Sequence, residues 1–143
     1  MRIKVLSLWQ PWATLMANGD KTIETRHWST NYRGPLAIHA AKRIVPVSEG
    51  VQAYERLAVR KIDPASLPRG AVVVIVDLLD VVPVEELSPW QSGGLYHVTK
   101  AEQALGNYAP GRYAWITRLR AELPEPIPLR GSQGLFTWDW QKG

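Results

Sequence analysis

Residues 21–26 read Lys-Thr-Ile-Glu-Thr-Arg, and this short stretch constrains the fold more than any other. The preceding Gly19-Asp20 pair is typical of a turn. The two threonines and the isoleucine that follow favour a short strand. Alternate residues of a strand share a face, so residues 22, 24 and 26 are predicted to point to one side and residues 23 and 25 to the other.

The polar face of this predicted strand gathers three charges. Lys21 lies at the mouth of the turn and can lean over the face that carries Glu24 and Arg26. An ammonium, a carboxylate and a guanidinium would then lie close together. The alternative is a solvated edge strand with a surface Glu–Arg pair, which would contribute little to stability.

Periodicity elsewhere predicts a mixture of strands and helices without a regular βαβ order, which favours an α+β fold over a doubly wound sheet. Besides the strand at 21–26, strands are expected at 2–8, 35–41, 71–82, 112–120 and 135–140, and helices at 11–18, 47–59 and 99–105.

Local signals suggest how the three helices begin. Pro11 suits the first helical position, with Gln10 as the N-cap. Thr99 and Glu102 have the spacing of a capping box. Ser48 is the candidate N-cap of the helix at 47–59, whose expected apolar stripe is Val51, Tyr54, Leu57 and Ala58.

Length and composition exclude several classes of protein. A chain of 143 residues predicts one domain, over 1–143, and 45% hydrophobic residues suit an ordinary core. There is no cysteine, which excludes disulfides, thiolate nucleophiles and cysteine zinc sites. The N-terminal residues lack the apolar core of a signal peptide, and the apolar run at 71–76 is too short to span a bilayer. We therefore expect a cytoplasmic protein, and the net charge of +4 gives a mild attraction for polyanions.

Neither a metal nor another cofactor is expected. His27, His39 and His97 show no ligand spacing with each other or with nearby carboxylates. The segment Gly131-Ser132-Gln133-Gly134 could bind an anion through backbone amides, or it is an ordinary tight turn. Ser132 is not part of a nucleophile elbow.

The candidate catalytic residues are Lys21, Glu24 and Glu102. A partly buried lysine beside another cation such as Arg26 can lose its proton and act as a base or nucleophile. Pairing with Glu24 would instead keep Lys21 charged, so that it stabilises an oxyanion while a carboxylate moves the proton. The sequence leaves both roles open, and Glu102 is also explained by its capping box alone.

Several further side chains are candidates for binding a substrate. Trp9 and Trp12 bracket a turn and could stack on a base. The side chains of Gln10 and Gln133 could read a base edge, and Lys42 could reach a phosphate or be solvated. His39 and Tyr113 are expected in the core, with Tyr113 or Trp115 also a candidate to line a cleft.

Four ordered segments resemble the ASCH domain, a branch of the PUA-like superfamily. They are Leu8-Trp9-Gln10-Pro11-Trp12, then Gly19-x-Lys21-x-x-Glu24-x-Arg26, then Gly34 to Lys42, and finally Pro110 to Trp115 with the later Pro126-Ile127-Pro128 and Gly131 to Gly134. The resemblance covers nearly the whole chain. It implies a small mixed β-barrel with flanking helices.

The resemblance also implies a site. ASCH domains are predicted to hold RNA or a nucleotide in a cleft built around the Gly-x-Lys-x-x-Glu-x-Arg strand. This implicates Lys21, Glu24 and Arg26, with Trp9-Gln10-Pro11-Trp12 as the facing wall. His39, Lys42, Tyr113, Ser132 and Gln133 complete the candidate binding set.

One branch of the family hydrolyses the amide of N4-acetylcytidine with a Thr-Lys-Glu set, in the motif Gly-x-Lys-Thr-x-Thr-x-Arg. This chain has Glu24 at the second threonine, so Thr22, Thr25 or Ser132 would supply the hydroxyl, a carboxylate-activated water would replace it, or the activity is absent. The Lys-Thr-Ile-Glu-Thr-Arg form also resembles the EOLA-like branch. Three hypotheses follow: a metal-independent amidohydrolase of N4-acylated cytosine nucleosides, a non-catalytic reader of RNA or modified nucleosides, and a ribonuclease.

Overall fold

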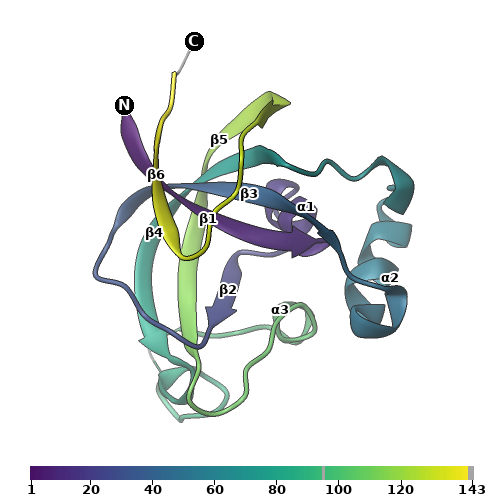
Figure 1. Cartoon of the computed structure of the whole chain (residues 1–143). Helices are drawn as coiled ribbons and strands as arrows, with labels where there is room; N and C mark the ends of the chain where they lie inside the picture. The colour runs from purple at the N-terminus through teal and green to yellow at the C-terminus, as the bar shows by residue number, and fades with distance from the viewer. Residues whose placement is uncertain (95, 142–143) are drawn as a thin grey trace.

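The structure, a computed structural model, describes residues 1–94 and 96–141. Six strands form one mixed sheet in the order β2-β5-β4-β3-β1-β6, and Figure 1 shows it curving into a barrel-like shape with α2 outside. The expected α+β class is confirmed. The strands are β1 (Arg2–Gln10), β2 (Ile23–Arg26), β3 (Gly34–Ile44), β4 (Ala71–Pro83), β5 (Tyr113–Pro128) and β6 (Leu135–Asp139), and the helices are α1 (Trp12–Ala17), α2 (Val51–Val59) and α3 (Lys100–Gln103).

The sheet curves because its longest strands pair irregularly. β4 pairs with β5 in antiparallel fashion, with register shifts at 72/74, 75/76 and 78/80. Such bulges bend a strand and increase its twist. β1 pairs with β3 in parallel and with β6 in antiparallel orientation. The pairing of β6 with β1 brings Met1 beside Trp140, and the Met1 amino group donates to the carbonyl of Trp140.

The core lies on both faces of β1. Leu6 and Leu8 pack in one cluster with Met16 of α1 and with Trp115 of β5, which is fully buried. Ile3 and other residues of opposite parity pack in a second cluster. Alternation along a strand explains this division. β1 is therefore packed on both faces, and its C-terminal end carries the first residues of the site.

The helix predicted at 47–59 is divided in two. A short 3₁₀ turn covers Val47–Glu49, Gly50 occupies the N-cap, and α2 begins at Val51. Ser48 is therefore not the N-cap, and the prediction was wrong on this point. The apolar stripe was partly wrong, because Ala53 and Leu57 are the buried residues of α2, while residues 51 and 58 are exposed.

The other boundaries shift less, with one exception. α1 begins at Trp12 with Pro11 as its N-cap, one residue later than predicted, and α3 is shorter than the predicted 99–105. β5 continues to Pro128, well past the predicted end at 120. Its prolines at 124 and 126 lie where the ladder to β4 is interrupted, between the pairs Val74–Glu122 and Val72–Ile127, so their missing N–H groups cost no ladder bond there. Among the described residues, no helix is long and apolar enough to cross a membrane.

Candidate nucleoside-binding cleft

A cleft of about 1310 Å³ opens at the edge formed by β1, β2 and α2. It is lined by residues 7–9, 12, 24–28, 48–53, 104–107, 112 and 132–134. These segments are distant in the sequence. Of the predicted site residues, the cleft brings together Trp9, Trp12, Glu24, Arg26, Ser132 and Gln133.

Lys21 is buried behind the cleft wall, with only 1% of its side chain exposed. Its ammonium donates to the carbonyls of Ile23 at 2.6 Å and Leu105 at 2.9 Å, and lies 3.4 Å from Oε1 of Glu24. Three acceptors match the three N–H bonds of a protonated lysine. The contacts fit a charged lysine that positions Glu24. A neutral lysine has two N–H bonds and could not donate to all three acceptors.

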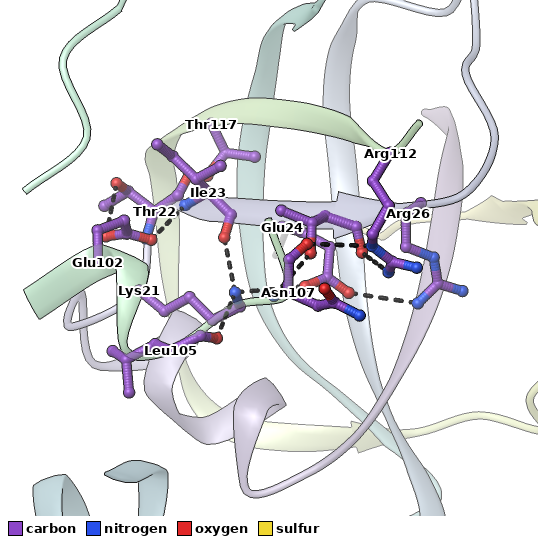
Figure 2. Close-up of polar contacts among 11 residues, drawn as sticks. Lys21, Thr22, Ile23, Glu24, Arg26, Glu102, Leu105, Asn107, Arg112 and Thr117 are labelled. Carbon is purple, nitrogen blue, oxygen red and sulfur yellow. Dashed lines mark hydrogen bonds and ion pairs between the residues drawn. The ribbon is translucent and has the colours of Figure 1, made fainter. Parts of the chain in front are cut away.

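Glu24 lines the cleft and contacts both cations of this cluster. Its Oε1 faces Lys21, and its Oε2 accepts from Nη1 of Arg26 at 3.2 Å. The side chain is 12% exposed, which leaves it accessible to a ligand in the cleft. Figure 2 shows the carboxylate between the two cations. The predicted convergence of these three charges is present in the structure.

Glu102 holds the strand from the opposite side. Its carboxylate accepts from the backbone N–H of Thr22 at 3.0 and 3.2 Å and from that of Ile23 at 2.8 Å. Thr99 caps α3 by accepting from the N–H of Glu102, so half of the predicted capping box forms. The other half does not, because the Glu102 carboxylate binds β2 instead (Figure 2). Glu102 does not line the cleft, which makes it a residue that positions β2.

A loop at residues 104–107 closes one side of the cleft, and β2 and Arg112 hold it. Thr25 accepts from the N–H of Asn107 at 3.2 Å. Arg112 donates to the carbonyls of both Asn107 and Thr25 at 3.0 Å. Because Arg112 directly precedes β5, these contacts tie the loop and β2 to the start of that strand.

Tyr108 directly follows this loop, and its hydroxyl group is buried without a partner among the described residues. Its ring stacks on Trp90. Burial raises the pKa of Tyr108, and the negative charges of Glu102 and Glu24 raise it further.

Aromatic side chains form two parts of the cleft wall. Trp9 is 51% exposed, with the guanidinium of Arg43 4.5 Å from its ring centre. Trp28 packs edge-to-face on Trp115 at 4.9 Å, and Arg26 lies 5.8 Å over its ring. Exposed tryptophan beside arginine offers a stacking surface to a base.

Three of the candidate binding residues line neither this cleft nor the second cavity described below. Gln10 is fully buried, and its amide is used internally: Oε1 accepts from the N–H of Thr14 at 3.0 Å, and Nε2 donates to the carbonyl of Pro68 at 2.8 Å. Pro11 is buried. Tyr113 packs against the core and pairs with Arg26 in the ladder. The expected reading of a base by Gln10 therefore has no support in its contacts.

A second cavity of about 830 Å³ adjoins the first and contains the remaining candidates. His39 and Lys42 line it, together with Arg130. Ser132 and Gln133 line both cavities, as does Ser7. His39 is 2% exposed, which agrees with the core histidine that the sequence predicted.

Sequence reasoning missed Ser7, Trp28, Asn107 and Arg112 as cleft residues. Trp28 continues the alternation of residues 24 and 26, so the period of the strand could have found it. Arg112 stands in a segment that carried the family resemblance. No local signal marks Ser7 or Asn107. In the part of the chain that the structure describes, no group of histidine and acidic side chains could hold a metal ion.

The curved mixed sheet with its few flanking helices defines a PUA-like, barrel-like protein. Solved ASCH structures from Zymomonas mobilis share this fold. A tyrosine-to-phenylalanine variant matches with a TM-score of 0.52 and 19% identity over 95% of this chain and 89% of that one. The unsubstituted protein matches with a TM-score of 0.51 and 19% identity, over 95% of this chain and 87% of that one.

The family model of the ASCH domain matches residues 6–122, and the chain belongs to this family. Activating signal cointegrator 1 from Mus musculus is 42% identical over 138 residues, which is 94% of this chain and 22% of the relative. Its Homo sapiens counterpart is 42% identical over 79 residues, or 52% of this chain and 14% of the relative. The chain thus spans less than a quarter of the length of these relatives.

Proposed function

We propose that the cleft binds cytosine nucleosides, free or within RNA, and that the protein hydrolyses an acyl group from the N4 amine of the base without a metal. The observation that carries this proposal is the Glu24 carboxylate, held at the cleft wall 3.4 Å from Lys21 and 3.2 Å from Arg26. Carboxylates accept hydrogen bonds from the N4 amine of cytosine. The same group is suited to proton transfer in an amide hydrolysis.

In the proposed reaction, a water molecule attacks the acyl carbonyl carbon and gives a proton to Glu24. The Arg26 guanidinium stabilises the oxygen anion of the tetrahedral intermediate. The C–N bond then breaks, and Glu24 returns the proton to the leaving N4 amine. Lys21 acts through Glu24, because its own donors are directed to Ile23, Leu105 and Glu24. Glu24 and Arg26 would be the catalytic residues, and Lys21 and Glu102 positioning residues.

Glu24→Gln tests this proposal. The substitution keeps the shape of the side chain but removes the base, so hydrolysis of N4-acetylcytidine should fall by about 10²- to 10⁴-fold, the range for a lost acid–base group. Mass detection of cytidine measures it. Glu55→Gln, an exposed carboxylate on α2, is the matched control and should keep the wild-type rate. A Glu24→Gln protein with full activity would contradict the mechanism.

A non-catalytic reader of RNA is the second candidate, and the exposed Trp9 beside Arg43 favours it. Binding to an RNA oligonucleotide would then weaken steeply with salt, because binding releases counterions from the phosphates. Fluorescence titration at several salt concentrations measures this dependence. Saturable, salt-sensitive RNA binding without hydrolysis of N4-acetylcytidine would favour the reader over the amidohydrolase.

A further inference from the structure

Ser7 and His39 form a hydrogen-bonded pair where the two cavities meet. Ser7 lies on β1 and His39 on the neighbouring β3, where the two residues pair across the parallel ladder. Ser7 Oγ is 2.9 Å from Nδ1 of His39, and Nε2 of the same ring is 2.7 Å from the carbonyl of Leu129. Ser7 is half-buried and lines both cavities.

The carbonyl of Leu129 decides the tautomer of the ring. A carbonyl only accepts hydrogen bonds, so Nε2 carries the proton that is donated to it. In the neutral ring Nδ1 is then an acceptor, and it receives the hydroxyl proton of Ser7. This is the arrangement of a hydroxyl nucleophile, a base within hydrogen-bond reach, and a third group that orients the base.

The loop at 131–133 completes the surroundings of the pair. A Cβ built on Gly131 would lie 2.8 Å from Cε1 of His39 and 3.6 Å from Oγ of Ser7, so only a glycine lets the loop approach this closely. Within residues 1–94 and 96–141, the backbone N–H groups of Gly131, Ser132 and Gln133 donate to no backbone carbonyl. Backbone N–H groups without an internal acceptor can serve as donors to an oxyanion.

We infer that Ser7 and His39 are the nucleophile and base of an acyl-transfer site that accepts carboxylic esters with an anionic group. The second cavity supports the anionic group, because its lining includes Lys42 and Arg130 and no carboxylate. This site is separate from Glu24 in its residues and does not depend on the amidohydrolase proposal.

The proposed reaction consumes only the ester and one water molecule. Ser7 Oγ attacks the ester carbonyl carbon, and its proton passes to Nδ1 of His39. The ester C–O bond breaks, and the leaving alkoxide takes that proton. Water then attacks the acyl–Ser7 ester and gives a proton to Nδ1, which returns it to Ser7 as the carboxylic acid leaves. Throughout, Nε2–H stays hydrogen-bonded to Leu129 and stabilises the charged ring.

A fluorophosphonate probe tests the nucleophile directly, since an activated serine displaces fluoride from its phosphorus. Intact mass and peptide mapping should locate the adduct on Ser7, and Ser7→Ala should not be labelled. Ser66, an exposed serine whose hydroxyl donates to the carbonyl of Asp63, is the control position. Ser66→Ala should label like the wild type. A wild-type protein that remains unlabelled, or a Ser7→Ala protein that labels equally, would overturn the inference.

His39→Gln tests the base. Glutamine keeps a donor for the Leu129 carbonyl but has no basic nitrogen, so labelling should slow by about 100-fold or more, as for a lost general base. Circular dichroism verifies that the variant is folded. Labelling of a folded His39→Gln protein at the wild-type rate would refute the role of His39. If His39→Gln does not fold, the peptide mapping of the adduct on Ser7 decides the test.

The predicted substrate class is tested with two chromogenic esters. Mono-4-nitrophenyl glutarate, which is anionic, should be hydrolysed with a kcat/KM at least about tenfold above that of neutral 4-nitrophenyl butyrate, because one favourable charge contact of about 1.4 kcal/mol corresponds to tenfold. Lys42→Ala should reduce that preference. Equal rates for the two esters would overturn the assignment of the second cavity to an anionic group.

Discussion

Replacing Lys21 by methionine should destabilise the protein severely. The side chain is 1% exposed, and its ammonium contacts three acceptors, namely the carbonyls of Ile23 and Leu105 and the carboxylate of Glu24. Methionine has a similar length and fills the same space, so the loss is mainly electrostatic. It leaves a carboxylate that is 12% exposed with Arg26 as its remaining charged partner.

The size of the loss follows from these contacts. Breaking a buried ion pair by removing one partner costs about 3–5 kcal/mol. Arg26 still contacts Glu24, so we expect Lys21→Met to lose about 3 kcal/mol, near the lower end of that range. Urea unfolding followed by tryptophan fluorescence measures it. Lys100→Met, at an exposed lysine on α3, is the control and should change stability by no more than about 0.5 kcal/mol.

A double mutant isolates the Lys21–Glu24 pair. In Lys21→Met/Glu24→Gln the uncompensated carboxylate is gone, so the loss should be smaller than the sum of the two single losses, with a coupling of about 0.5–3 kcal/mol. A Lys21→Met protein less than about 1 kcal/mol below wild type, or additive single effects, would refute the reasoning that this lysine is a buried partner of Glu24.

Three other predictions concern single residues of the same region. Glu102→Ala should lose about 1.5–3 kcal/mol in urea unfolding, because the N–H groups of Thr22 and Ile23 lose a charged acceptor, whereas Glu102→Gln keeps one oxygen and should lose less. Trp9→Ala should weaken ligand binding by about 1–3 kcal/mol per stacked base. Because Trp9 is half exposed, the substitution should change stability little. Val47→Ala, at another exposed residue, is the control, and equal ligand binding by the two variants would exclude stacking at Trp9. The pKa of Tyr108 is raised in the folded protein, so as pH rises above about 10 the unfolded chain loses its phenolic proton first. The neutral phenol therefore contributes its full stability below about pH 10, and this contribution is lost as pH rises toward the folded pKa. Unfolding melts at pH 9 and 11 should therefore show a smaller alkaline loss for Tyr108→Phe than for wild type, and an equal loss would contradict the assignment.

The sequence alone determined the features that depend on neighbours in the chain. The alternation of residues 22–26 predicted which side chains share a face, and the structure buries residues 23 and 25 while Glu24 and Arg26 are partly exposed. The turn at Gly19-Asp20 and the cap of Thr99 on α3 were local as well. These features hold because backbone geometry sets the direction of side chains within a few residues.

The tertiary structure alone decided the role of each charged or polar group. Lys21 reaches Glu24 as expected, but its ammonium is also buried and donates to the carbonyl of Leu105, 84 residues away. The carboxylate of Glu102 binds β2 rather than its own helix, and the side-chain amide of Gln10 hydrogen-bonds to Thr14 and Pro68. Ser7 meets His39 only because β1 and β3 pair in parallel in this register. A side chain's partner depends on which distant backbone groups the curved sheet brings within hydrogen-bond distance, and no spacing along the chain encodes that.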